Sequence, residues 1–359
     1  MPQTTEHPLA RRLRLTGQRL HELLVRRERR IITIGVIIFV AIVAIVGAWK
    51  IWALAYNALD LAIYNQVAWN SVHGRWFEFS IHPHSYLGDH LEIAFALLWP
   101  LYALVQHPLT LIVLQAAAIA IAAIPLMRIA AHFVGKPWHL LFGLAYLANP
   151  TIQNMALYEF HMLPFAIPLV SWALVGYVER KYRLFLLCAA LALTVREDIS
   201  FVIIGFGLLA LADRRSWRWW AVPIGLGVAW LLGSLKLSAI LNDYGSYKFL
   251  IYYAWLGDSV PNIILGALRQ PWLVIQHLLS FQNLGFLAGL LLPFALLPIF
   301  RLRWMIPAGL TLLQLLLAVS SGELLIEIHY PAVTIPFLVT AAAAAFRSVL
   351  SPPRTGIFR

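Results

Sequence analysis

The sequence has few charged residues and almost no cysteine, and each scarcity excludes a class of protein. Only 12% of its 359 residues are charged, while 61% are hydrophobic and the mean hydropathy is +0.77. A soluble domain of this length needs more polar surface than that. The single cysteine, Cys188, excludes an intrachain disulfide, and its apolar setting favours an unreactive thiol. No His-Glu-x-x-His motif occurs, which argues against a zinc protease.

Long apolar runs dominate what the sequence does contain. The clearest cover residues 31–48, 109–127, 219–235, 284–300 and 331–346. They approach or exceed the roughly 18–20 residues that a helix needs to cross about 30 Å of hydrocarbon. A helix also satisfies every backbone polar group of such a run within lipid. The sequence therefore predicts an all-α integral membrane protein with several spans.

The net charge of +11 is distributed in short clusters between these runs. Eight arginines lie within residues 1–30, and further basic clusters occupy 128–136, 180–183, 214–218, 301–303 and 347–359. This is the positive-inside pattern of a membrane protein, so we expect no nucleic-acid partner. No convincing small-residue cleavage site follows the first run, and we therefore expect an uncleaved first span with a cytoplasmic N-terminus.

The segment 91–105 (LEIAFALLWPLYALV) conflicts with this pattern if it crosses the membrane. A crossing there would place the basic cluster at 128–136 on the wrong side, and the segment is short and contains Pro100. We therefore predict a re-entrant or interfacial helix against the outer face. Both termini are then cytoplasmic in the plasma membrane, and ten helices cross it: 31–54, 109–128, 138–150, 162–178, 184–196, 199–212, 218–236, 283–300, 303–319 and 331–346.

This map divides the chain into a basic cytoplasmic segment (1–30), a membrane domain (31–346) and a basic cytoplasmic tail (347–359). The outer loops of the membrane domain are 55–108, 151–161, 237–282 and 320–330. On this map 21 of the 27 lysines and arginines are inside, whereas 11 of the 16 acidic residues and eight of the 12 histidines are outside. Acidic residues contribute little to topology. Their gathering on the outer side predicts a functional site there.

Asp60 is the first candidate in that outer site, because it follows the first span and precedes a helical segment. A carboxylate facing a cavity suits a general base or a metal ligand. An aspartate at this place also suits a cap for the helix that follows it, and both interpretations stay open. Gln66, further along the same segment, is a candidate substrate-binding residue.

Asp89 and His90 belong to a cluster of acidic residues and histidines in the same loop, HPHSYLGDHLE at 82–92. His82 and His84 with the nearby Asp-His pair could ligate a divalent cation. The spacing matches no closed metal motif, and solvated histidines are the alternative, so we assign no metal ligand. Asp89 is the stronger candidate as a carboxylate facing the substrate.

Glu159 and His161 lie where an irregular loop re-enters the membrane. They could relay a proton or bind a phosphate, or they could form a satisfied interfacial pair. The sequence Arg196-Glu197-Asp198 joins two short spans, at a depth where charges are costly and usually functional. Arg196 could hold an anionic head group or pair with either neighbour. The remaining substrate-binding candidates are Lys248, His329 and Tyr330.

Five landmarks, in order, resemble a prokaryotic membrane-protein family known only as a domain of unknown function. They are LDLAIYNQVAWNSVHGR, LGDHLEIAFALLWPLYAL with HPLTLIVLQAAAIAIAAIPL, YEFHMLPFAIPLVSWAL, VREDISFVIIGFGL and HYPAVTIPF. The resemblance covers roughly residues 45 to 345. That family in turn looks like the GT-C superfamily of glycosyltransferases, which use sugars carried on polyprenyl phosphates.

The resemblance implies a catalytic acid in the first outer loop, a position matched by Asp60, followed by a helix along the outer face. Asp89 matches a second acid later in that loop. The implied partners are a polyprenyl-phosphate sugar donor and membrane lipid, and a divalent cation is an open question. The sequence has no clear Asp-x-Asp pair in this loop and no large soluble C-terminal domain, which favours a lipid or envelope-polymer acceptor over a protein.

Two other functions remain open. A transporter or flippase would place Glu197, Asp198 and His161 along a permeation route. It should also carry internal repeats, and the two halves of the sequence show no convincing one. A non-catalytic subunit of a larger membrane complex would tolerate changes in the outer acids.

Overall fold

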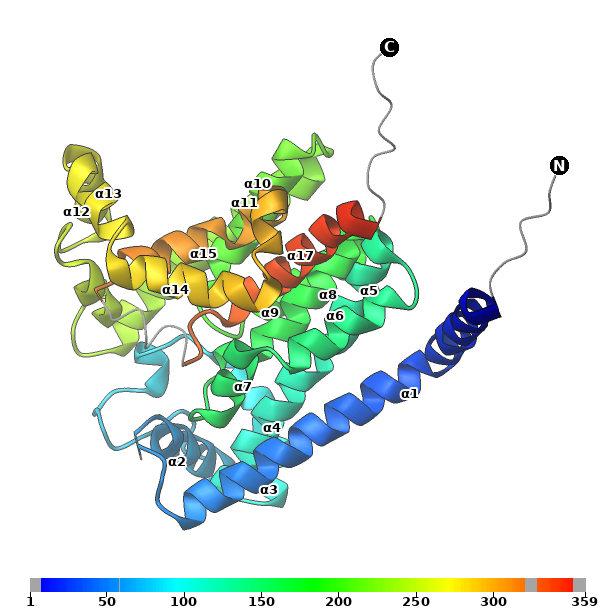
Figure 1. Cartoon of the computed structure of the whole chain (residues 1–359). Helices are drawn as coiled ribbons and strands as arrows, with labels where there is room; N and C mark the ends of the chain where they lie inside the picture. The colour runs from blue at the N-terminus through cyan, green and yellow to red at the C-terminus, as the bar shows by residue number, and fades with distance from the viewer. Residues whose placement is uncertain (1–7, 58, 320–327, 351–359) are drawn as a thin grey trace.

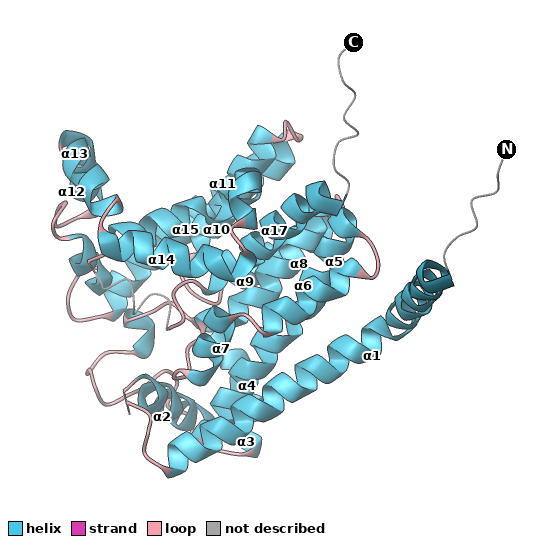
Figure 2. Cartoon of the chain, viewed as in Figure 1, coloured by secondary structure: helices cyan, strands magenta, loops and turns pink. Residues whose placement is uncertain are grey.

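The computed structural model of the chain describes residues 8–57, 59–319 and 328–350. Within these residues every regular element is a helix and none is a strand (Figure 2). The predicted all-α class is therefore confirmed. Most of the predicted outer loop 320–330, the tail from 351 and residues 1–7 of the basic segment lie outside the described residues.

Sixteen α-helices are described, and most are short. They are α1 (Pro8–Trp52), α2 (Asp60–Val72), α3 (Trp99–Leu104), α4 (Pro108–Ile121), α5 (Ala123–Val134), α6 (Trp138–Leu147), α7 (Pro150–Leu157), α8 (Ala166–Val178), α9 (Tyr182–Leu193), α10 (Ile199–Ala212), α11 (Trp217–Leu241), α12 (Val260–Arg269), α13 (Pro271–Leu278), α14 (Phe281–Leu291), α15 (Ile306–Leu317) and α17 (Ile335–Leu350). Short 3₁₀ helices join them: η1 (Tyr86–Gly88), η2 (Ile93–Leu98), η3 (Leu163–Phe165), η4 (Lys248–Tyr253), η5 (Leu292–Phe294), η6 (Leu297–Met305) and η7 (Ala332–Thr334).

Four helical segments of the described chain are long and apolar enough to cross a membrane: His21–Trp52, Pro108–Val134, Trp217–Leu241 and Leu297–Leu317. A fifth is reached if α13 and Phe281–Phe294, bent by 50°, form one broken span. Three of these segments each overlap one predicted span. Leu297–Leu317 instead begins within the predicted span 283–300 and contains the predicted inner loop 301–303, and the broken segment begins within the predicted outer loop 237–282. The other predicted spans correspond to shorter helices, so length and composition alone do not establish ten crossings.

The segment predicted to be re-entrant or interfacial consists of η2 and α3. Its 12 residues, Ile93–Leu104, are apolar. At a rise of 1.5–2.0 Å per residue they extend about 20 Å, which is less than the hydrocarbon thickness. Pro100 lies in the first turn of α3. The length of this element agrees with a helix that does not cross.

Basic loops that are far apart in the sequence meet at one end of the helix bundle, which we call the basic end. Arg128 binds Glu179 with Nε and Nη2 at 2.5 and 2.6 Å from the two carboxylate oxygens. Lys136 Nζ lies 2.5 Å from Glu28. Arg303 Nε donates to Asp213 at 2.8 Å. The Phe133 and Trp304 rings, with centroids 5.4 Å apart, join these contacts, so four of the predicted inner loops and the part of α1 around Glu28 lie at one end.

The candidate site lies at the other end of the same helices. Both α8 and α10 start beside candidate residues, after His161 and Asp198, and end at the basic end, at Glu179 and Asp213. In Figure 1 the start of α1 and the end of α17 lie toward the right, whereas α2 lies at the lower left. The fold therefore separates two charged ends, as the positive-inside pattern predicts.

Candidate functional site

The start of α2 is capped by a residue from another segment. Asp60 is the first residue of α2, and the preceding residue, Leu59, makes no capping hydrogen bond through its side chain. The carboxylate of Glu159, which is 2% exposed, accepts the N–H of Asn57 at 2.8 Å and of Leu61 at 2.7 Å. The alternative in which Asp60 caps this helix is therefore wrong, because Glu159 has that role.

Asp60 instead faces His161. The distance from Asp60 Oδ2 to His161 Nε2 is 3.3 Å, and the Asp60 side chain is 35% exposed. Burial by itself would raise the pKa of Asp60, but the hydrogen bond and charge of His161 outweigh it and lower the pKa. Asp60 is thus an ionised, partly open carboxylate at neutral pH. The predicted Glu159–His161 side-chain pair does not form.

His329 and Tyr330 complete this part of the site. The rings of His161 and His329 stack with centroids 3.5 Å apart, and Tyr330 lies 4.5 Å from His329. Burial, then the charge of His161, holds the pKa of His329 well below its usual value, so this imidazole is neutral. Within the described chain the buried His329 Nδ1 has no hydrogen-bond partner. Four predicted residues are therefore brought close together: Asp60, His161, His329 and Tyr330.

Gln115, which the sequence analysis missed, holds the loop that carries His161. Its Oε1 accepts the His161 N–H at 2.6 Å, and its Nε2 donates to the carbonyls of Met155 and Glu159 at 3.2 and 3.4 Å. The side chain is fully buried in α4. A glutamine within the apolar run 109–127 was the available signal, because a buried amide must find partners.

Glu197 forms a second network with His90. Its carboxylate lies 2.8 Å from His90 Nδ1, accepts the Leu91 N–H at 3.0 Å and accepts the Tyr247 hydroxyl at 2.5 Å. Burial would raise the pKa of Glu197, but the charge of His90 outweighs it and brings the pKa to about 2. The pKa of His90 is raised correspondingly, since the attraction of Glu197 outweighs burial. The two residues therefore form an ion pair between a buried carboxylate and a partly buried imidazole.

Arg196 pairs with Asp198, which is one of the two alternatives left open by the sequence. Its Nε donates to Asp198 Oδ1 at 2.9 Å and its Nη2 donates to Oδ2. Both residues are less than a tenth exposed. Asp198 therefore compensates the charge of this buried guanidinium through two of its three nitrogens.

Asp89 binds Lys248 rather than standing alone. Lys248 Nζ lies 2.5 Å from Asp89 Oδ2, and His84 Nε2 lies 3.1 Å from Oδ1. Burial would raise the pKa of Asp89, but the hydrogen bond from Lys248 outweighs it and lowers the pKa. Because Asp89 precedes His90 and Lys248 follows Tyr247, this pair is continuous with the Glu197 network.

The donors around Asp89 do not fit a bound divalent cation. The two ring nitrogens of His84 face Asp89 and, at 3.3 Å, Asp243, while Lys248 supplies a positive charge beside Asp89. In the part of the chain that the structure describes, no group of three or more such residues could hold a metal ion. The cluster is better described as an ion-pair network between the first outer loop and η4.

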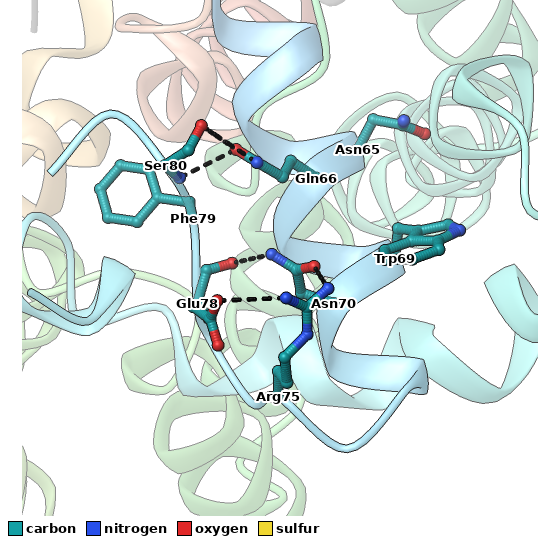
Figure 3. Close-up of a pocket in the computed structure, with 8 residues that line it drawn as sticks. All are labelled: Asn65, Gln66, Trp69, Asn70, Arg75, Glu78, Phe79 and Ser80. Atoms are coloured by element: carbon teal, nitrogen blue, oxygen red, sulfur yellow. Dashed lines mark hydrogen bonds and ion pairs between the residues drawn. The ribbon is translucent and has the colours of Figure 1, made fainter. Parts of the chain in front are cut away.

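Gln66 lies in a separate pocket of about 430 Å³ beside α2 (Figure 3). Its amide oxygen accepts the Ser80 N–H at 3.0 Å, and Asn70 donates to the Glu78 carbonyl at 2.8 Å. The other lining residues are Asn65, Trp69, Arg75 and Phe79. At 100° per residue Gln66 points about 120° away from Asp60 around the helix. The structure therefore does not bring Gln66 into the Asp60 cluster.

Glu92 is a further buried acid that the sequence analysis did not select. It is 1% exposed and accepts hydrogen bonds at 2.9 Å from the hydroxyls of Tyr64 and Tyr86. Burial raises the pKa of Glu92 to about 7. Its position in the acidic and histidine-rich segment 82–92 was the only signal in the sequence.

Comparison with known proteins gives a family but no activity. No curated protein and no solved structure matches the chain. One family model, described as "Predicted membrane protein (DUF2079)", matches residues 50–354. This range includes every predicted site residue and nearly all of the helices described above. The chain therefore belongs to the DUF2079 family of predicted membrane proteins, whose function is unknown.

Proposed function

We propose that the protein is a GT-C-like membrane glycosyltransferase that transfers a sugar from a polyprenyl-phosphate donor to a lipid or envelope-polymer acceptor. In this proposal the chain crosses the plasma membrane ten times, with both termini and the basic end in the cytoplasm. The cluster of Asp60, His161 and His329 then faces the non-cytoplasmic side. The division of charge between the two ends of the bundle supports this orientation.

The proposal rests on one observation: Asp60 is a partly exposed carboxylate that does not cap α2, because Glu159 does. Glu159 satisfies the N–H groups at the start of α2. His161 keeps Asp60 ionised and fixes its orientation from 3.3 Å. A carboxylate that is held, ionised and open to a ligand has the properties of a general base.

In the proposed reaction Asp60 accepts the proton of an acceptor hydroxyl while that oxygen attacks the anomeric carbon of the donor. The bond between this carbon and the phosphate oxygen breaks, and the oxygen keeps the electron pair. The polyprenyl phosphate leaves without needing a proton. We propose that His161, which lies 3.3 Å from Asp60, and His329, which stacks on His161, interact with the donor phosphate.

The surrounding ion pairs would position these groups. Asp89 and Lys248 present a carboxylate and an ammonium group side by side, and the Lys248 side chain is 26% exposed. We propose that this pair orients the acceptor or the phosphate. The pairs Glu197–His90 and Arg196–Asp198 fix the loops around the site.

The pocket around Gln66 supports a carbohydrate acceptor. Its lining combines amide side chains with the exposed Trp69 indole and an Arg75–Glu78 pair whose charges cancel. Neutral hydrogen-bonding groups beside an aromatic plane suit a polyhydroxylated ring. Its volume falls within the roughly 300–1,000 Å³ typical of small-ligand sites. We propose that it holds part of the acceptor away from the reacting hydroxyl.

A proton-coupled transporter is the second candidate, and Glu92 favours it. A buried carboxylate with a pKa of about 7 exchanges protons near neutral pH, as transport relays do. The adjacent buried network of His90 and Glu197 would extend such a relay. Transport would require Glu92 and tolerate Asp60→Asn, whereas transfer would require Asp60.

The test uses membranes that contain the wild type, Asp60→Asn or Asp258→Asn. Asp258 is an exposed acid whose one side-chain hydrogen bond among the described residues is to Asn262, so it controls for loss of an acidic side chain. Each membrane receives polyprenyl-phosphate mannose or glucose, and mass spectrometry measures the released polyprenyl phosphate. We expect release from the wild type and Asp258→Asn and a loss of about 10²–10⁴-fold in Asp60→Asn. Equal release from all three would remove Asp60 as the base.

A further inference from the structure

The basic end contains a hollow that the proposed transferase does not use. Its volume is about 580 Å³, and it lies between α5, η6 and α17. Three arginines line it, Arg301, Arg303 and Arg347, together with Phe133, Trp304, Ala344 and Ser348. The hollow is therefore basic and partly aromatic, and it lies at the opposite end of α17 from His329 and Tyr330.

Two of these three charges have no acidic partner among the described residues. Arg303 is compensated by Asp213, with Nε at 2.8 Å. Within the described residues, Arg301 donates to the Ser348 hydroxyl at 2.6 Å and to the Phe300 carbonyl at 3.0 Å and to no carboxylate. For Arg347 the described chain provides no ion pair at all. Two guanidinium groups around one cavity leave an excess positive charge that a phosphate would neutralise.

The backbone that presents these arginines is held in an uncommon conformation. Ala295 and Leu296 both have positive φ, at 50° and 59°, although neither is glycine. Arg301 departs from helical geometry with φ −142° and ψ 46°. Positive φ at Ala295 and Leu296 persists only where the surrounding structure enforces it, and such residues concentrate at ligand sites. Here the turn brings Arg301 and Arg303 to the same side as the end of α17.

The surroundings of the hollow match a lipid rather than a soluble anion. η6 begins the candidate membrane span Leu297–Leu317, so its arginines lie near the end of a span, where lipid head groups lie. Apolar side chains from the same turn are exposed beside the arginines: Ile299 by 45%, Phe300 by 68% and Leu302 by 62%. Acyl chains would cover these groups while the phosphate meets the guanidinium groups.

We infer that this hollow is a binding site for the phosphate head group of an anionic phospholipid of the inner leaflet. Arg301 and Arg347 contact the phosphate, and Trp304 lies beside it. Phe133 and Trp304 pack edge to face with centroids 5.4 Å apart, and the Arg303 guanidinium lies 5.2 Å from the Trp304 ring. The site thus has a preformed wall. Its occupancy links α5, η6 and α17 and does not depend on the proposed transferase activity.

The test measures lipid binding to the full-length protein in detergent by native mass spectrometry. The probes are phosphatidylglycerol, zwitterionic phosphatidylcholine and inorganic phosphate, and the variants are Arg347→Gln, Arg301→Gln and the pair together. Arg218→Gln is the matched control, because Arg218 is also a basic-end arginine beside a tryptophan, Trp217, and does not line the hollow. Arg347→Gln removes no bond within the described chain, so it tests the site even if Arg301→Gln impairs folding.

We expect phosphatidylglycerol to bind more tightly than phosphatidylcholine, with an affinity loss of about fivefold for each arginine removed and none for Arg218→Gln. Equal binding of the two lipids would overturn the inference. Equal losses in the control and the paired variant would overturn it as well, since the effect would be one of general charge. Inorganic phosphate that displaces phosphatidylglycerol at millimolar concentration would assign the hollow to a soluble anion instead.

Discussion

Removing the carboxylate of Glu159 should destabilise the start of α2 more than removing any exposed acidic side chain of the same loops would. This side chain is buried and accepts two backbone N–H groups at 2.8 and 2.7 Å. A hydrogen bond to a charged group contributes about 1.5–3 kcal/mol, and an unsatisfied buried N–H costs about 1–3 kcal/mol. The N–H of Asn57 is only partly buried and can recover water. We therefore expect Glu159→Ala to cost about 3–5 kcal/mol.

Glu159→Gln should cost less, about 1–3 kcal/mol, because its amide oxygen still accepts one of the two N–H groups. Glu78→Ala is the matched control, since Glu78 is exposed and its contact with Arg75 is 3.4 Å long. Exposed pairs contribute at most about 1 kcal/mol. The expected order of destabilisation is thus Glu159→Ala, then Glu159→Gln, then Glu78→Ala.

The assay is unfolding of the purified protein in mixed micelles, combined with hydrogen exchange. The free energy of unfolding gives the cost, and the amides of Asn57 and Leu61 should lose protection in Glu159→Ala. A cost equal to that of Glu78→Ala, with unchanged protection of both amides, would refute the assignment of Glu159 as the cap. Capping by Glu159 would then no longer explain why the carboxylate of Asp60 is partly exposed and faces His161.

Three further predictions concern Glu92, His161 and Gln115. Burial raises the pKa of Glu92 from 4.5 to about 7. The protonated carboxyl group therefore stabilises the fold fully below pH 4.5, and about 3 kcal/mol of this stability is lost as the pH rises through 7. Glu92→Gln should make the melting temperature less dependent on pH between pH 5 and 8, and an unchanged dependence would contradict this. His161→Asn removes the partner that lowers the pKa of Asp60, so the acid limb of the pH–activity profile should move to higher pH, and an unmoved limb would exclude His161 as that partner. Gln115→Leu leaves the buried His161 N–H unpaired and should lower the free energy of unfolding by about 2–4 kcal/mol in denaturant titrations, whereas a neutral effect would show that the loop is held elsewhere.

The membrane class followed from composition, because apolar runs of this length have few other stable structures. The segregation of charge along the chain was also evident from the sequence. In the structure, contacts such as Arg128–Glu179 and Arg303–Asp213 bring predicted inner loops together. The number of crossings was harder to obtain from sequence. Helices such as α9 and α10 are shorter than a bilayer is thick, and nothing in their sequence tells whether they cross or end inside protein.

The sequence analysis named residues that lie close together in the structure, but not which of them contact one another. Asp60 and His161 were both candidates, but their pairing depends on residues about 100 positions apart in the chain. Spacing suggested instead that Glu159 pairs with His161, two residues away. The capping by Glu159 and the bracing by Gln115 are long-range contacts with no local pattern. Such partners are fixed by how the helices pack, which local periodicity does not encode.

The most direct test of the account compares envelope glycolipids and glycans by mass spectrometry in cells that express the wild type, Asp60→Asn, Asp258→Asn or no protein. Western blotting shows that the variants are present, and a folded state that persists in detergent shows that they are intact. We expect that one glycan or glycolipid is lost equally in the null and Asp60→Asn strains and retained with Asp258→Asn. A glycan profile in Asp60→Asn cells that matches the wild type while the null differs would contradict it, and the transporter or subunit interpretation would replace it.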